Sequence, residues 1–100
     1  MKERVFLITM KTPIGLRKGK FSFQEESGVI FGLLEILGHA NVFEGSKDEN
    51  GKITIQSEFQ SFKKSVRYDA EGTIQDNMLA LYLNDGKHTY KIEGTEMQDG

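Results

Sequence analysis

Side chains able to do acid–base or metal chemistry are sparse in this sequence. The chain has 100 residues, no cysteine and two histidines, His39 and His88, which lie in different halves. Without a thiol, a covalent mechanism needs a serine or threonine nucleophile, and no Gly-x-Ser-x-Gly elbow is present to hold one. Two distant histidines without a local ligand spacing do not predict a metal site. The sequence therefore predicts no catalytic residue, no metal site and no cofactor.

Two glycine-containing loops match ligand-binding motifs only in part. Asp48-Glu49-Asn50-Gly51 looks like the start of a calcium loop, but the later bidentate glutamate is missing. Residues 15–20 place basic side chains beside glycines without the spacing of a phosphate-binding loop. We interpret Asn50-Gly51 as a type I′ hairpin turn, because both residue types tolerate a positive φ.

Basic residues are concentrated at the start of the chain. Residues 1–24 hold six Lys or Arg and one acid, whereas residues 25–100 hold seven basic and fourteen acidic residues. Binding of single-stranded nucleic acid would need aromatic rings on that basic face. Phe21 and Phe23 instead alternate with Lys18 and Lys20, so we expect both rings to point into a core. The pattern argues against nucleic-acid binding and favours a solvated lysine-rich edge.

Short alternating segments separated by turns predict an all-β chain. From Ile53 to Phe59, apolar and polar residues alternate, so one face of that strand meets a core and the other meets water. Such segments with regular turn signals are typical of an antiparallel sandwich or barrel. We expect a single domain, residues 1–100, folded as an up-and-down meander β-barrel of about eight strands at 4–12, 15–24, 28–37, 39–47, 52–61, 64–74, 78–84 and 88–96.

The segment Val29–Leu37 also fits a helix, with Ser27 as its N-cap and Gly38 just past its end. Gly32 in its middle costs a helix about 1 kcal/mol relative to alanine. We favour a strand in which Gly32 marks a bend.

Three segments, Val5–Met10, Val29–Leu37 and Met78–Leu83, are apolar on both faces. The outer face of an antiparallel sheet is usually polar, so an apolar outer face needs a cover. A homo-oligomer is one explanation, and packing inside a two-sheet sandwich is another.

A short phrase occurs three times, as Glu44-Gly45-Ser46, Glu71-Gly72-Thr73 and Glu93-Gly94-Thr95. The spacing is about that of two short strands with their turns. In an up-and-down sheet it places the same feature at the same height on every second strand.

Composition favours a reducing compartment. The lack of cysteine excludes disulfides, and the apolar run Val5–Met10 is too short for a signal-peptide core. No stretch approaches the roughly 20 apolar residues that a membrane span needs. We expect a cytoplasmic protein without a membrane partner.

The order of turns and glycines resembles a largely uncharacterised bacterial family of eight-stranded meander barrels that are calycin-like, related in shape to lipocalins and avidins. The matching elements are Thr12-Pro13-Ile14-Gly15, Gly28-Val29-Ile30-Phe31-Gly32, Phe43-Glu44-Gly45, Ile53-Thr54-Ile55, Tyr68 leading to Gly72, and Tyr90 leading to Gly94. The chain has no tryptophan, so it lacks the residue that marks true lipocalins and those that line a biotin site. The resemblance implies the barrel and leaves the ligand open.

An eight-stranded barrel is just wide enough to be filled by side chains or to hold one small ligand. The first hypothesis is therefore a non-enzymatic barrel that binds a small apolar or aromatic molecule at its open end. Candidate contacts are inward-facing residues with some polar handles, with His88 expected at the rim: Phe43, Ser57, Phe59, Tyr68, His88 and Tyr90. The second hypothesis is a filled barrel that acts as a structural or interaction module and forms a homo-oligomer.

Overall fold

The computed structural model describes residues 3–36, 38–60 and 65–97, and the side chains of residues 39, 57–60 and 65–66 lie outside that description. No helix occurs among the described residues, so none there is long and apolar enough to cross a membrane. The described elements are β1 (Glu3–Thr12), β2 (Gly15–Glu26), β3 (Val29–Ile36), β4 (His39–Lys47), β5 (Lys52–Gln60), β6 (Ser65–Gln75), β7 (Met78–Asn84) and β8 (Thr89–Glu96).

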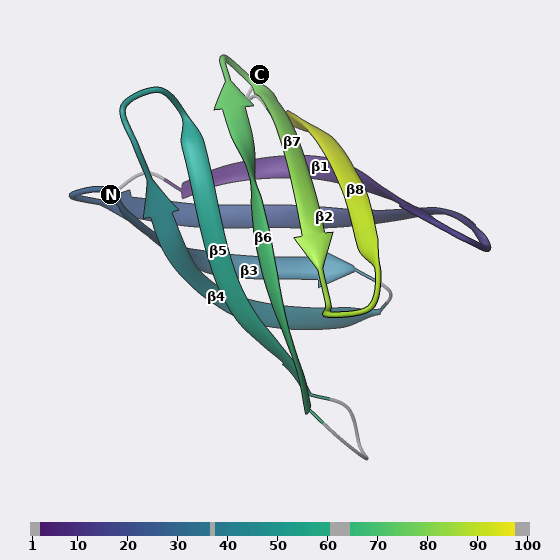
Figure 1. Cartoon of the computed structure of the whole chain (residues 1–100). Helices are drawn as coiled ribbons and strands as arrows, with labels where there is room; N and C mark the ends of the chain where they lie inside the picture. The colour runs from purple at the N-terminus through teal and green to yellow at the C-terminus, as the bar shows by residue number, and fades with distance from the viewer. Residues whose placement is uncertain (1–2, 37, 61–64, 98–100) are drawn as a thin grey trace.

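The strands form one closed antiparallel barrel. Each strand pairs with its neighbours in sequence, and β1 pairs with β8 from Phe6↔Glu96 to Met10↔Ile92. Figure 1 shows β1–β3 running across β5–β8, while β4 bends from one group toward the other. The predicted all-β meander barrel of eight strands is confirmed, and the strand bounds lie within two residues of those expected.

The segment that also fitted a helix is a strand, so the helical alternative is wrong. Val29–Ile36 pairs with β2 on one side and with β4 on the other. Gly32 is required because the backbone of β2 passes close to it. A Cβ at this position would overlap the carbonyl oxygen of Ser22 and lie 2.7 Å from the Cα of Phe23.

The repeated glycines lie on every second strand, as predicted. Gly45, Gly72 and Gly94 belong to β4, β6 and β8, and each belongs to the inward-facing set of its strand. The three glycines are not level in the strand pairing. The partners of Gly45 and Gly72 lie two residues apart on β5, and those of Gly72 and Gly94 lie two residues apart on β7. Such a stagger follows from the tilt of strands in a closed barrel.

One apolar cluster occupies the barrel interior. The Phe21 and Phe43 rings stack with their centroids 4.8 Å apart. Burying each large apolar side chain contributes about 1.5–3 kcal/mol relative to leaving it in water. The cluster consists of Phe6, Ile8, Met10, Phe21, Phe23, Ile30, Leu34, Ile36, Phe43, Ile53, Ile55, Tyr68, Ala70, Ile74, Leu79, Leu81, Leu83 and Ile92.

The turn between β4 and β5 differs from the predicted type I′ hairpin. Gly51 has a φ of 85°, but Asn50 is not in the positive-φ region. The Oδ1 atom of Asp48 accepts the backbone N–H groups of Asn50 and Lys52, both at 2.9 Å. A four-residue loop organised by an aspartate therefore replaces the two-residue turn, because this side chain satisfies the loop's backbone donors.

The outer surface carries exposed lysines on β2 and exposed apolar residues on other strands, and the sequence predicted both. Phe21 and Phe23 are buried in the core, and Lys18 and Lys20 are exposed. Apolar residues are nevertheless exposed on the outer faces of the two-sided strands, including Leu7 on β1, Leu33 on β3 and Met78 on β7.

Candidate functional site

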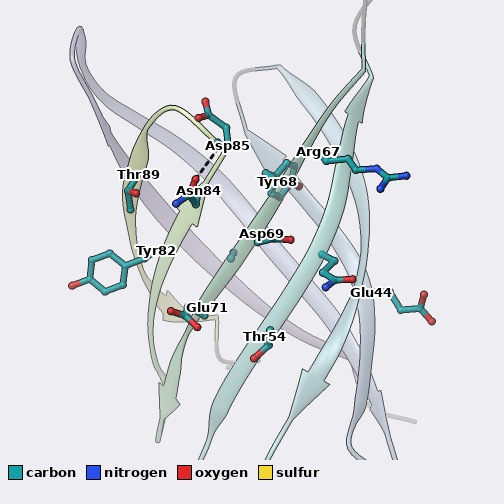
Figure 2. Close-up of a pocket in the computed structure, with 13 residues that line it drawn as sticks. Glu44, Thr54, Arg67, Tyr68, Asp69, Glu71, Tyr82, Asn84, Asp85 and Thr89 are labelled. Carbon is teal, nitrogen blue, oxygen red and sulfur yellow. Dashed lines mark hydrogen bonds between the residues drawn. The ribbon is translucent and has the colours of Figure 1, made fainter.

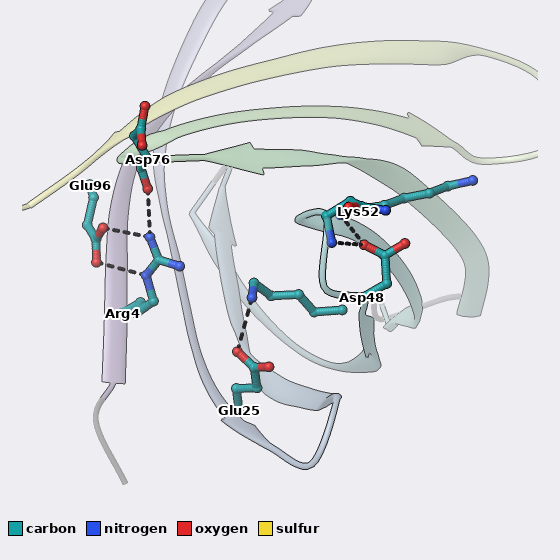
Figure 3. Close-up of polar contacts among 8 residues, drawn as sticks. Arg4, Glu25, Asp48, Lys52, Asp76 and Glu96 are labelled. Carbon is teal, nitrogen blue, oxygen red and sulfur yellow. Dashed lines mark hydrogen bonds and ion pairs between the residues drawn. The ribbon is translucent and has the colours of Figure 1, made fainter.

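The side chain of Arg4 lies at one end of the barrel interior. This residue belongs to the inward-facing set of β1, and its guanidinium carbon lies 5.2 Å from the ring centroid of Phe6 and 5.9 Å from that of Phe23. Its Nε and Nη2 atoms donate to the Glu96 carboxylate at 3.0 and 2.8 Å, and Nη2 also donates to the carbonyl oxygen of Asp76 at 3.0 Å. Figure 3 shows this fork, which ties β1 to β8 and to the β6–β7 turn.

The hydrogen bond to Glu96 is the largest cause that raises the pKa of Arg4 above its ordinary value, and the charges of Glu96 and Glu25 add to it against the effect of burial. A second ion pair joins Lys47 Nζ and Glu25 Oε1 at 3.4 Å. These residues belong to the inward-facing sets of β4 and β2, on the end of the barrel where Arg4 lies. Charged pairs therefore occupy this end, and we do not place an apolar ligand there.

At the opposite end, the β5–β6 hairpin leaves both of its neighbours. Pairing of β4 with β5 ends at Phe43↔Ser57, and pairing of β6 with β7 ends at Asp69↔Asn84. The two hairpin strands stay paired with each other as far as Gln60↔Ser65. In Figure 1 the end of β5 and the start of β6 project beyond the other strands. We call this end of the barrel the mouth.

The structure brings several predicted site residues together below the mouth. Phe43, Ser57 and Tyr68 form one row of directly paired positions across β4, β5 and β6. Phe43 and Tyr68 are buried, and the half-buried Tyr90 packs against the same cluster. The side chains of Ser57 and Phe59 lie outside the described residues, so their part in the site stays a prediction.

His88 lies just before β8, at the end of the barrel where it was expected, and its inward orientation stays a prediction. Its side chain is exposed, and its ring centroid lies 6.1 Å from that of Tyr90. Asp85 Oδ1 accepts the N–H groups of Lys87 and His88 at 2.9 and 2.8 Å. These bonds hold the backbone of His88 in the turn before β8.

Asn41 is a buried polar residue that the sequence reasoning missed. It is 7% exposed, and its Nδ2 donates to the carbonyl oxygen of Leu34 at 3.3 Å. A signal was present, because Asn41 has the same parity as the predicted inward residue Phe43 in β4. A polar residue at an inward position is a candidate for orienting a ligand.

A hollow of about 1270 Å³ lies along the outer faces of β4–β8 (Figure 2). Tyr68 and Ala70 also line it although their side chains are buried, so the hollow reaches the point where β6 leaves β7. Near this point, bonds from the backbone N–H groups of Lys87 and His88 hold the pKa of Asp85 below its ordinary value. The lining residues are Glu44, Thr54, Gln56, Arg67, Tyr68, Asp69, Ala70, Glu71, Tyr82, Asn84, Asp85, Gly86 and Thr89.

The acidic residues of the hollow do not form a metal site. Among the described residues there is no group of three or more His, Cys, Asp or Glu side chains placed to hold a metal ion. The hollow is instead a mixed surface, with Glu44, Asp69 and Glu71 beside Arg67 and Tyr82.

Comparison with known proteins finds one similarity, and it is a likeness of fold. No protein-family model and no curated protein matches the sequence. Among solved structures, the chain is similar to a redesigned β-barrel, mFAP1, bound to DFHBI. The TM-score is 0.64 at 14% sequence identity, over 94% of this chain and 92% of that chain. At this identity the similarity supports the barrel architecture alone.

Proposed function

We propose that this protein is a non-enzymatic barrel that binds a small apolar or aromatic molecule at its mouth. The observation that carries the proposal is the difference between the two ends of the barrel. Charged pairs of Arg4 with Glu96 and of Lys47 with Glu25 lie at one end, whereas at the other end the β5–β6 hairpin departs from both neighbouring strands. A ligand at the mouth would rest on the stacked rings of Phe21 and Phe43.

The chemistry of the mouth suits an aromatic ligand with one or two polar groups. Tyr68 and Tyr90 supply ring surfaces, and Asn41 supplies an amide whose oxygen is not used in its bond to Leu34. Such a combination of apolar lining and few polar groups is typical of small-molecule sites. The similar barrel mFAP1 is bound to DFHBI, an observation that supports a ligand of this class. Ser57, Phe59 and His88 remain in the proposed set of contacts.

Fluorescence and thermal-shift titration test the proposal, with DFHBI and a panel of aromatic and aliphatic molecules as the probes. For molecules that bind, Tyr90→Ala should weaken affinity at least about tenfold, because a buried ring contributes more than 1.4 kcal/mol to many ligand sites. Tyr82→Ala is the matched control, since its exposed ring lies on the outer face of β7. A panel without any binder, or binding that Tyr82→Ala removes and Tyr90→Ala spares, contradicts a site at the mouth.

A second candidate function is an interaction module with a filled barrel. The large apolar cluster inside the barrel and the exposed apolar residues outside it favour this alternative. We also propose that the protein is related to the calycin-like family, which the glycine and turn pattern supports. A cytoplasmic location is proposed as well, and the lack of cysteine supports it.

A further inference from the structure

The outer faces of β1, β3 and β4 carry exposed apolar residues on both sides of a polar β2. They include Leu7 on β1, Phe31 and Leu33 on β3, and Val42 on β4, which is 74% exposed. We call these four residues the apolar patch. Single exposed apolar residues are common, but a contiguous patch on one face marks an interaction site.

The register places Leu33 beside Val42 and next to Phe31, whereas the polar outward positions of β2 separate Leu7 from these three. Val5, Ser22, Leu33 and Val42 are directly paired across β1, β2, β3 and β4, so their side chains stand in one row. Ser22 alternates with buried Phe21 and Phe23 and therefore faces outward, yet it is only 8% exposed. Its neighbours in the row shelter it, as expected if the apolar side chains pack together.

We propose that a second copy of this chain packs on this face in a two-fold symmetric dimer. The charges beside the patch fit that occupant. Lys20 and Glu35 are directly paired on β2 and β3, in the row next to Ser22 and Leu33. The described ion pairs do not include Lys20 with Glu35, and both side chains are exposed.

A two-fold axis parallel to the strands, between β2 and β3, satisfies both charges, and in the next row it places Ser22 opposite Leu33 of the partner subunit. It places Lys20 opposite Glu35 of the partner subunit and, by symmetry, Glu35 opposite the partner's Lys20. The same rotation places Val5 opposite the partner's Val42. Self-complementarity of this kind is what a two-fold interface requires. Its cost is a rim contact between Glu3 and the partner's Glu44, which solvent and salt screen.

The size of the face indicates how strongly the two subunits should associate. Four strands spaced about 4.8 Å apart, over about seven residues of about 3.3 Å each, give a footprint of at most roughly 440 Å² per subunit, because the barrel wall curves away from a partner at β1 and β4. Stable interfaces bury about 800 Å² per partner, so this contact belongs to the weak class. We therefore expect a dimer that dissociates in the micromolar range. The dimer does not depend on ligand binding at the mouth.

Sedimentation velocity from about 1 to about 200 µM measures the association, and charge reversal identifies the surface. Lys20→Glu and Glu35→Lys should each weaken the homodimer at least about tenfold, because like charges then face each other. An equimolar mixture of these two variants should form a heterodimer, since each chain then offers the charges that the other lacks. The double variant should restore self-association.

The control is Lys52→Glu, which makes the same charge change at an exposed position on β5. It should leave the dimer unchanged, and a far-UV circular dichroism melt of each variant checks that the barrel is folded. A protein that stays monomeric over the whole concentration range overturns the proposal. A dimer whose affinity neither charge reversal changes overturns this interface, and so does the absence of a heterodimer in the mixture of the two variants.

Discussion

At the scale of single residues, Arg4 ties the first strand of the barrel to the last. Its side chain and that of Glu96 are 26% and 21% exposed, so solvent only partly screens their paired hydrogen bonds. Arg4→Ala also leaves the Asp76 carbonyl oxygen without this donor. We expect a loss of about 1.5–3 kcal/mol in the free energy of unfolding, measured by urea denaturation.

The matched control for Arg4 is Lys91, which pairs with Glu93 at 3.0 Å on the outer face of β8. Both side chains of this pair are largely exposed, and exposed ion pairs contribute little to stability. Lys91→Ala should therefore leave the urea midpoint almost unchanged. Equal losses for the two variants would mean that Arg4 acts only as a surface charge.

Asp85 gives stability a defined pH dependence. The backbone N–H groups of Lys87 and His88 hold its pKa below the ordinary value of 3.8. A group whose pKa is lower in the folded state stabilises the fold above its unfolded pKa, and loses that effect as pH falls through its folded pKa. Asp85→Asn should be less stable than the parent at pH 6, and the difference should vanish well below pH 3.8.

Denaturant titrations at pH 6 and at the lowest pH where both proteins fold measure this difference, and carboxyl NMR gives the pKa of Asp85 directly. A carboxyl that titrates at or above its ordinary value would show that the turn does not hold the charged form.

At the scale of elements, the strands bend because glycines let neighbouring backbones approach. A Cβ on Gly72 would overlap the carbonyl oxygen of Ala80 on β7 and lie 2.8 Å from the Cα of Leu81. Neither backbone atom can move without shifting the strand. Gly72→Ala should therefore lower the free energy of unfolding by about 1–3 kcal/mol or more.

Gly38→Asn is the control for the bend, because nothing lies within 4 Å of a Cβ at Gly38 and its φ is 78°. Asparagine adopts this left-handed region more readily than other residues with a side chain. The urea midpoint should change much less than for Gly72→Ala. If Gly72→Ala proves neutral, the close approach of β6 and β7 is not needed for the bend.

At the scale of the whole molecule, local patterns predict strands well and contacts around their ends poorly. Ile53 and Ile55 were placed inward because alternation decides a strand's two faces. The turn before β8 was not predicted in detail, because it depends on hydrogen bonds from Lys87 and His88 to Asp85, which alternation does not encode. Asn41 was missed because one polar residue in an apolar set is a weak signal. At the mouth, the β5–β6 hairpin separates from its neighbours where the β4–β5 and β6–β7 pairings end. Those end points follow from strand pairing across the barrel rather than from any short motif.

Closure between the first and last strands is the most non-local feature of the fold. β8 buries Ile92 and pairs with both β7 and β1, and just after it the N–H of Met97 donates to the Val5 carbonyl oxygen at 2.7 Å. Ending the chain at Lys87 would remove both ladders and leave β1 and β7 as sheet edges. Exposed edges and a lost core side chain favour aggregation over a smaller barrel.

We therefore expect the chain truncated at Lys87 to lose its cooperative thermal transition and to elute as aggregate in size-exclusion chromatography. A circular permutant is the matched control, with a short Gly/Ser linker joining the original ends and a new start at Asn50 in the β4–β5 turn. It interrupts the chain equally but keeps all eight strands, and the 2.7 Å bond between Met97 and Val5 places the joined segments side by side. Because closure needs only the pairing of β1 with β8, the permutant should fold cooperatively, whereas a truncated chain that melts as a cooperative monomer would show that seven strands suffice.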